Sequence, residues 1–163
     1  MSTIILTPEH GYVLLAASGS FLLNFWQTTK IGGKRRELKI EAKSIINFSK
    51  RNKLFILFSF VILQYPAQWS DKHPMFNCYQ RAHQNTLEYL PLYLALLMGG
   101  GVRHPLLASI AGALWLAARI IYSLGYYSGE PKGRIPGALL SMLTLATLFG
   151  ATVSSGAGLL GWW

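Results

Sequence analysis

Most apolar residues of this chain are gathered into long blocks that carry almost no charge. Gly11–Gln27 and Ile135–Trp163 contain no charged residue, and Leu106–Leu124 contains only Arg119. Each block is close to the roughly 20 residues that a helix needs to cross a bilayer. Phe76–Gly101 is a fourth candidate, polar at its start and apolar at its end. The chain is therefore expected to be an all-α membrane protein, a bundle of four transmembrane helices over about residues 11–29, 76–99, 105–127 and 135–160.

The positive charges are concentrated in two connecting segments. Of the 15 lysines and arginines, ten lie between Lys30 and Pro74, and Lys132 and Arg134 add two more. Four helices place these segments on one side of the membrane, whereas the opposite loop carries only Arg103. The positive-inside rule then makes the basic side cytosolic, with both termini on the far side. This distribution of the +9 net charge favours anionic lipid headgroups, and no nucleic-acid partner is expected.

A polar run, Arg81–Tyr89, stands at the start of the second expected span. Arg81, Asn85 and Glu88 are spaced at i, i+4 and i+7, so a helix puts them on one stripe. A charge within a bilayer span costs roughly 3 kcal/mol on insertion scales. Such residues usually face a bundle interior or a wet cavity, so the run predicts a functional site.

A second polar stripe falls near the end of the third expected span. Arg119, Tyr122 and Tyr126 follow one another at i, i+3 and i+7. The connecting segments on the cytosolic side add three arginines, Arg35, Arg36 and Arg134. Both stripes and these arginines are expected near the cytosolic ends of the helices.

This set of residues suits a small anionic ligand with peptide character. Arginines bind carboxylates through two parallel hydrogen bonds. Glu88 is suited to an ammonium group and Asn85 to an amide, and tyrosine hydroxyls donate to a sulfur or an oxyanion. The sequence contains no metal-binding cluster, phosphate-binding glycine loop or nucleophile elbow, so no metal is expected.

Structural roles are open for the same charged residues. An ion-pair network between helices is the alternative for Arg81, Arg119 and Glu88, because buried charges need partners. A histidine at a position such as His83 more often packs between helices, with its hydrogen bonds satisfied, than takes part in catalysis.

Interfacial roles are open for others. Tyr122 and Tyr126 suit an aromatic belt at the membrane surface. Arg35 and Arg36 suit the headgroups of anionic lipids.

Three motifs give the chain a family resemblance. The segment Phe76–Glu88 reads FNCYQRAHQNTLE and closely resembles the signature of the MAPEG family, the membrane-associated proteins of eicosanoid and glutathione metabolism. Gly99–Pro105, GGGVRHP, and Gly125–Pro131, GYYSGEP, fit the branch of microsomal glutathione S-transferase of the third type. The match is loose over Glu9–Lys39 and good over Tyr65–Leu160.

The resemblance implies a homotrimer that binds glutathione between subunits near the cytosolic face. It implies a membrane-bound glutathione S-transferase with glutathione-dependent lipid-hydroperoxide peroxidase activity, and it leaves leukotriene-C synthase activity open. The implied partners are glutathione as co-substrate, a hydrophobic electrophile or lipid hydroperoxide, and membrane lipids. The implied location is the endoplasmic reticulum membrane, with the nuclear envelope and the mitochondrial outer membrane as alternatives.

The resemblance also assigns roles to individual residues. Positions that bind glutathione in the family match Arg35, Arg81, His83, Asn85, Glu88, Tyr89, Tyr122 and Tyr126. Arg134 matches the arginine that stabilises the glutathione thiolate, and Arg36 matches one that acts on the second substrate. These two arginines are the expected catalytic residues.

Two other functions remain open from the sequence. One branch of the same family is a non-catalytic lipid-binding scaffold. Charges within expected spans are also found in small transporter or channel subunits. The intact run Arg81–Tyr89 and the presence of Arg134 favour the enzyme.

The chain departs from the family pattern in one place within its single expected domain, residues 1–163. Family members pass directly from a basic stretch like Arg35–Glu41 to Tyr-Pro, whereas Tyr65-Pro66 follows Ala42–Gln64 in this chain. We interpret residues 42–64 as an insertion in the cytosolic loop, and a translated intron is one possible origin for it.

Overall fold

The computed structural model describes residues 6–40 and 69–162, and these ranges are helical with no strand. The helices are α1 (His10–Glu37), α4 (Pro74–Gly101), α5 (Pro105–Tyr127), the short 3-10 helix η1 (Pro131–Arg134) and α6 (Ile135–Leu159). The predicted all-α fold with four long helices is confirmed. The expected insertion at residues 42–64 lies outside the described residues.

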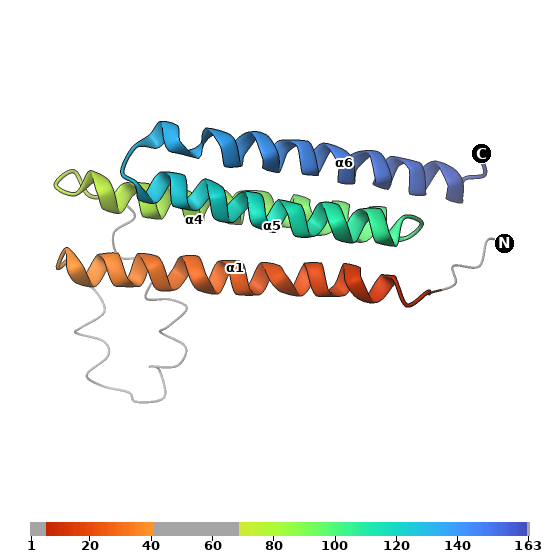
Figure 1. Cartoon of the computed structure of the whole chain (residues 1–163), viewed down its shortest axis with the longest axis horizontal. Coiled ribbons are helices and arrows are strands. Elements are labelled where there is room, and N and C mark those ends of the chain that lie inside the picture. The colour runs from red at the N-terminus through yellow and green to blue at the C-terminus, as the bar shows by residue number, and fades with distance from the viewer. Residues whose placement is uncertain (1–5, 41–68, 163) are drawn as a thin grey trace, which may run out of the picture.

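The four long helices form an up-and-down bundle (Figure 1). Both α4 and α5 pack against each other and against the two outer helices, and α1 and α6 lie on opposite sides of this central pair. The start of α1 and the end of α6 share one end of the bundle. The last turn of α1, with Lys34, Arg35 and Arg36, lies at the other end together with η1. This end is called the basic end below.

Two helical segments are long and apolar enough to cross a membrane. They are Pro105–Tyr127 and Pro131–Leu159, each with a mean hydropathy of 1.6 over its best window. Large apolar side chains also face outwards from α1 and α6, among them Leu15, Phe21, Leu139 and Leu143. Such outer faces suit lipid or a neighbouring subunit. That α1 and α4 also span the membrane stays a prediction.

An aromatic pair anchors the apolar half of the bundle, away from the basic end. The rings of Tyr93 on α4 and Trp115 on α5 stack with centroids 4.0 Å apart, and both side chains are fully buried. The Tyr93 hydroxyl shares its one proton between the carbonyl oxygens of Ala16, at 3.2 Å, and Gly112, at 3.4 Å. A buried hydroxyl is costly unless it is hydrogen-bonded, so these bonds tie α4 to α1 and α5.

Glycines bring α6 and η1 close to α5 at the basic end. A Cβ atom added to Gly137 would overlap the backbone nitrogen of Tyr122. Gly125 and Gly133 face each other in the same way, because a Cβ on either would meet the other's backbone. Small residues at a helix interface permit such close approach. The approach holds η1, and with it Arg134, against the end of α5.

We expect the change Gly137→Ala to destabilise the bundle. The added methyl group has no space beside Tyr122, and overpacking of this kind costs about 1–3 kcal/mol. Thermal unfolding in detergent should show a lower midpoint. Gly150→Ala is the control, because nothing lies within 4 Å of a Cβ at that position. Equal midpoints for the two variants would contradict the close α5–α6 contact.

Candidate functional site

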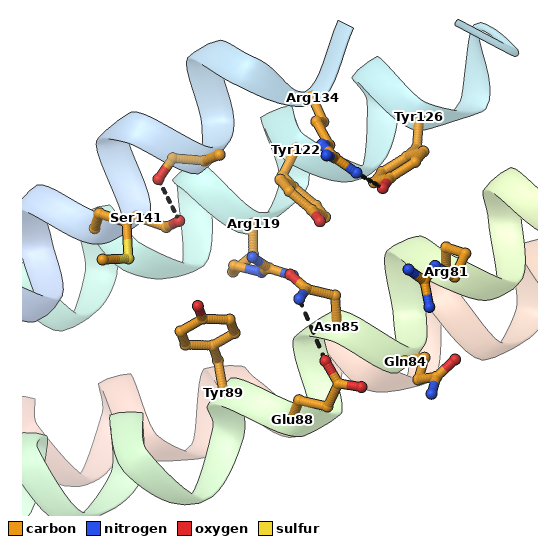
Figure 2. Close-up of a pocket in the computed structure, with 12 residues that line it drawn as sticks. Arg81, Gln84, Asn85, Glu88, Tyr89, Arg119, Tyr122, Tyr126, Arg134 and Ser141 are labelled. Atoms are coloured by element: carbon orange, nitrogen blue, oxygen red, sulfur yellow. Dashed lines mark hydrogen bonds between the residues drawn. The ribbon is translucent and has the colours of Figure 1, made fainter. Parts of the chain in front are cut away.

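A pocket of about 350 Å³ lies between α4, α5 and the start of α6, towards the basic end. Its volume is within the range of small-molecule binding sites. The lining residues are Arg81, Gln84, Asn85, Glu88 and Tyr89 from α4, Arg119, Tyr122 and Tyr126 from α5, and Arg134, Ala138, Ser141 and Met142 from η1 and α6 (Figure 2). Both polar stripes recognised in the sequence therefore line one pocket.

The pocket carries more positive than negative charge. Three guanidinium groups, those of Arg81, Arg119 and Arg134, line it together with the single carboxylate of Glu88. Across residues 6–40 and 69–162, the salt bridge present joins Lys34 and Glu37, away from the pocket. No described carboxylate therefore neutralises a pocket arginine by direct contact. A pocket of this kind attracts an anion.

Arg134 is placed at the pocket by contacts with Tyr126. Its Nη1 donates a hydrogen bond to the Tyr126 hydroxyl, shown as a dashed line in Figure 2. The Arg134 guanidinium carbon also lies 5.2 Å from the centre of the Tyr126 ring, within the range of a cation–π contact. The Tyr126 ring in turn meets the Tyr122 ring edge-on, with centroids 5.2 Å apart. The aromatic pair thus orients an otherwise exposed arginine.

Arg119 lies at the inner wall of the pocket and is only 2% exposed. Its Nη2 donates to Asn85 Oδ1 at 3.0 Å and to Thr86 Oγ1 at 2.8 Å, and its Nε donates to Thr86 Oγ1 at 3.2 Å. Its guanidinium carbon is 4.0 Å from the centre of the Tyr122 ring. Neutral oxygens and an aromatic face therefore hold this buried cation.

Asn85 connects Arg119 to the pocket carboxylate. The Asn85 side chain accepts from Arg119, and its Nδ2 donates to Glu88 Oε2 at 3.4 Å (Figure 2). In the described part of the chain, Arg119 and Glu88 are thus linked through the Asn85 amide. They do not form the direct ion pair that was one interpretation of the sequence. The amide keeps the carboxylate close to the cations without neutralising them.

Three residues assigned to the site from the sequence do not line this pocket. Arg35 and Arg36 belong to the last turn of α1, on the side of the central pair opposite α6. The Arg35 guanidinium carbon lies 5.0 Å from the centre of the Phe76 ring. His83 is 4% exposed and is absent from the pocket wall. The other assigned residues, Arg81, Asn85, Glu88, Tyr89, Tyr122, Tyr126 and Arg134, line the pocket together.

Some lining residues were not singled out as ligands from the sequence. Gln84 stands four residues before Glu88, and this helical spacing is the signal that places it beside the stripe of Arg81, Asn85 and Glu88. Arg119 was placed on a stripe but received no role toward a ligand. Ser141 and Met142 lie in an uncharged helix where no pattern marks them as pocket residues.

A family comparison extends over nearly all of this helical bundle. The model of the MAPEG family matches residues 13–154, which include every residue of the pocket. The chain belongs to the MAPEG family. MAPEG proteins are membrane-bound and include glutathione transferases. Within the described ranges, no group of three or more His, Cys, Asp or Glu side chains is arranged to hold a metal ion.

Two curated proteins are similar to this MAPEG chain over part of its length. An uncharacterized protein of Synechocystis sp. is 39% identical over 75 residues, which is 45% of this chain and 55% of that protein. Human microsomal glutathione S-transferase 2 is 37% identical over 81 residues, which is 48% of this chain and 54% of that protein. The chain thus spans about half the length of the curated relatives that it matches.

Proposed function

We propose that this protein is a membrane-bound glutathione S-transferase that also reduces lipid hydroperoxides with glutathione. The observation that carries the proposal is a pocket in which three guanidinium groups face one carboxylate. Glutathione is a tripeptide with two carboxylates, one ammonium group and a thiol, so its charges are complementary to this set. The similarity to human microsomal glutathione S-transferase 2 supports the same substrate.

The pocket residues divide naturally among the groups of glutathione. Arg81 is exposed at the pocket and suits a carboxylate, which an arginine binds through two hydrogen bonds. Glu88 suits the ammonium group, and Asn85 suits a peptide amide. The hydroxyl groups of Tyr89 and Tyr122 supply further donors along the same wall.

Arg134 is proposed to activate the thiol. A free thiol has a pKa of about 8.5, so only about 3% is ionised at pH 7. A guanidinium beside the sulfur favours the thiolate, and a pKa lower by about two would make the thiol mostly ionised. Tyr126 holds the Arg134 guanidinium at the pocket through its hydroxyl, so this cation is already in place when glutathione binds.

The thiolate then serves both reactions. With an electrophile, its sulfur forms a bond to carbon while the leaving group departs with the bonding electrons. With a lipid hydroperoxide, the sulfur takes one oxygen and releases the alcohol, and a second glutathione displaces that oxygen as water to give the disulfide. Met142 and the apolar outer face of α6 provide a surface along which a lipid-soluble partner reaches the sulfur.

The finer assignments follow from the same proposal. A homotrimer would bring the end of α1 from one subunit to the pocket of the next, which gives Arg35 and Arg36 access to the ligand. His83 is 4% exposed within one subunit, so its assignment to the glutathione site rests on the family resemblance alone. The branch is proposed to be the third type of microsomal glutathione S-transferase, and the location the endoplasmic reticulum membrane. Leukotriene-C synthesis is a further candidate reaction of the same thiolate.

We expect Arg134→Ala to lower kcat about 25-fold, because a thiol pKa that returns from about 6.5 to about 8.5 lowers the ionised fraction at pH 7 from about 76% to about 3%. Glutathione-dependent rates should be measured on the detergent-purified chain with a halogenated aromatic and with a lipid hydroperoxide. Lys132→Ala is the matched control, since Lys132 belongs to the same 3-10 helix but does not line the pocket.

Equal background rates for wild type and Arg134→Ala with both substrates would refute the enzyme. They would favour the non-catalytic lipid-binding scaffold instead. Activity in Arg134→Ala equal to a high wild-type rate would refute the role of Arg134 alone.

We expect Arg81→Ala to weaken glutathione binding about 10- to 100-fold, because a hydrogen bond to a charged group contributes about 1.5–3 kcal/mol. Titration calorimetry on the purified chain measures this directly. Arg103→Ala removes an arginine from the connection between α4 and α5, which lies at the opposite end of the bundle, and should leave the affinity unchanged. An unchanged affinity in Arg81→Ala would contradict its role in binding.

A further inference from the structure

A buried chain of hydrogen bonds crosses from α1 to the pocket. It begins at Gln27 on α1, which is 0% exposed and does not line the pocket. Gln27 Nε2 donates to Thr86 Oγ1 on α4 at 2.9 Å and to Ser123 Oγ on α5 at 2.7 Å. The Gln27 carboxamide thus joins α1, α4 and α5 beside the pocket wall.

The direction of each bond in this chain is set by the protons available. The Thr86 hydroxyl donates its proton to the Ala82 carbonyl at 3.0 Å, and the Ser123 hydroxyl donates to the Arg119 carbonyl at 2.8 Å. Each hydroxyl has one proton, so both accept from Gln27. Gln27 therefore has to present its amino group, and its Oε1 is left buried without a hydrogen-bond partner in the described part of the chain.

Thr86 passes this orientation on to two pocket residues. With its proton committed to Ala82, its oxygen accepts from Nε and Nη2 of Arg119. Arg119 Nη2 also donates to Asn85 Oδ1, which turns the amino group of Asn85 towards Glu88. We call this series of contacts the Gln27 relay. It runs from Gln27 through Thr86, Arg119 and Asn85 to Glu88.

Nothing comparable is seen for the neighbouring amide on α1. Asn24 lies one turn earlier, is half-buried, and its Nδ2 donates to the Ser20 carbonyl of its own helix at 2.9 Å. Gln27 differs because it bonds to side chains of α4 and α5, and because those side chains hold a pocket cation. A general need to fill the α1 interface would not require this connection.

We propose that Gln27 is a positioning residue of the glutathione site, acting through Thr86 on Arg119 and Asn85. The proposal rests on the proposed function. Without the Gln27 amide, the Thr86 oxygen keeps only Arg119 as a donor partner and α1 no longer restrains it. Arg119 and Asn85 then sample other rotamers, and the wall that meets the peptide is no longer preformed. We therefore expect a lower affinity for glutathione and an unchanged affinity for the hydrophobic substrate.

The decisive variants are Gln27→Met and Thr86→Val, which keep the side-chain shape and remove the polar groups. We expect each to raise the Kd and KM for glutathione about tenfold, with the KM for the halogenated aromatic unchanged. Because both act through one chain of contacts, the double variant should be no worse than the worse single variant. Thr86→Ser keeps the hydroxyl and should bind nearly as wild type. Asn24→Leu is the matched control on α1.

Calorimetry, steady-state kinetics and thermal unfolding of the full chain in detergent separate the outcomes. A tenfold loss in Gln27→Met and Thr86→Val, absent in Asn24→Leu and Thr86→Ser, supports the relay. Lower unfolding midpoints with unchanged glutathione Kd would show that Gln27 only packs α1, and would overturn the proposal. Additive losses in the double variant would also overturn it. Absence of glutathione binding by the wild type would overturn the proposed function itself, and this assignment with it.

Discussion

Among the described residues, the Arg119 guanidinium is buried between helices with no carboxylate in direct contact, and this ion constrains the residues around it. Taking an ion out of water costs several kcal/mol, and the cost must be offset by fixed dipoles or by an anion. Around Arg119, the Thr86 hydroxyl, the Asn85 amide and the Tyr122 ring supply the dipoles. None of them cancels its charge. The wall of the pocket therefore keeps a positive potential, which a bound carboxylate or thiolate would neutralise.

This arrangement requires α4, α5 and α6 to keep their spacing. Hydrogen bonds weaken steeply when the donor and acceptor move beyond about 3.5 Å, so a small shift of α5 would break the bonds of Arg119 to Thr86 and Asn85. Two contacts limit such shifts. The stacked rings of Tyr93 and Trp115 join α4 to α5 in the apolar half, and Gly137 holds α6 against the backbone of Tyr122 at the basic end. The pocket lies between these two fixed points, which explains why a membrane-type bundle offers a preformed polar wall.

The sequence predicted the parts of the site that depend on local spacing. Arg81, Asn85 and Glu88 line the pocket because helical periodicity alone puts them on one face. The contact of Gln27 with Thr86 was not predictable in this way, because it joins neutral residues 59 positions apart. Uncharged polar residues in a span leave no periodic signal, and which of them meet depends on helix rotation. Arg119 was recognised on a stripe by its charge and spacing, but its bonds to Asn85 and Thr86 were not predictable, because these partners come from another helix.

If Arg35 binds glutathione as proposed, the pocket of a single chain is only part of the site. The Arg35 side chain lies over the Phe76 ring at the start of α4, whereas the pocket is lined by residues of α4, α5, η1 and α6 and by none of α1. No rotamer carries a side chain around two packed helices, so within one subunit Arg35 and Arg134 serve different surfaces. A role for both on one glutathione requires two subunits. The exposed apolar side chains of α1 and α6, such as Phe21 and Leu143, are the faces on which such a contact would be built.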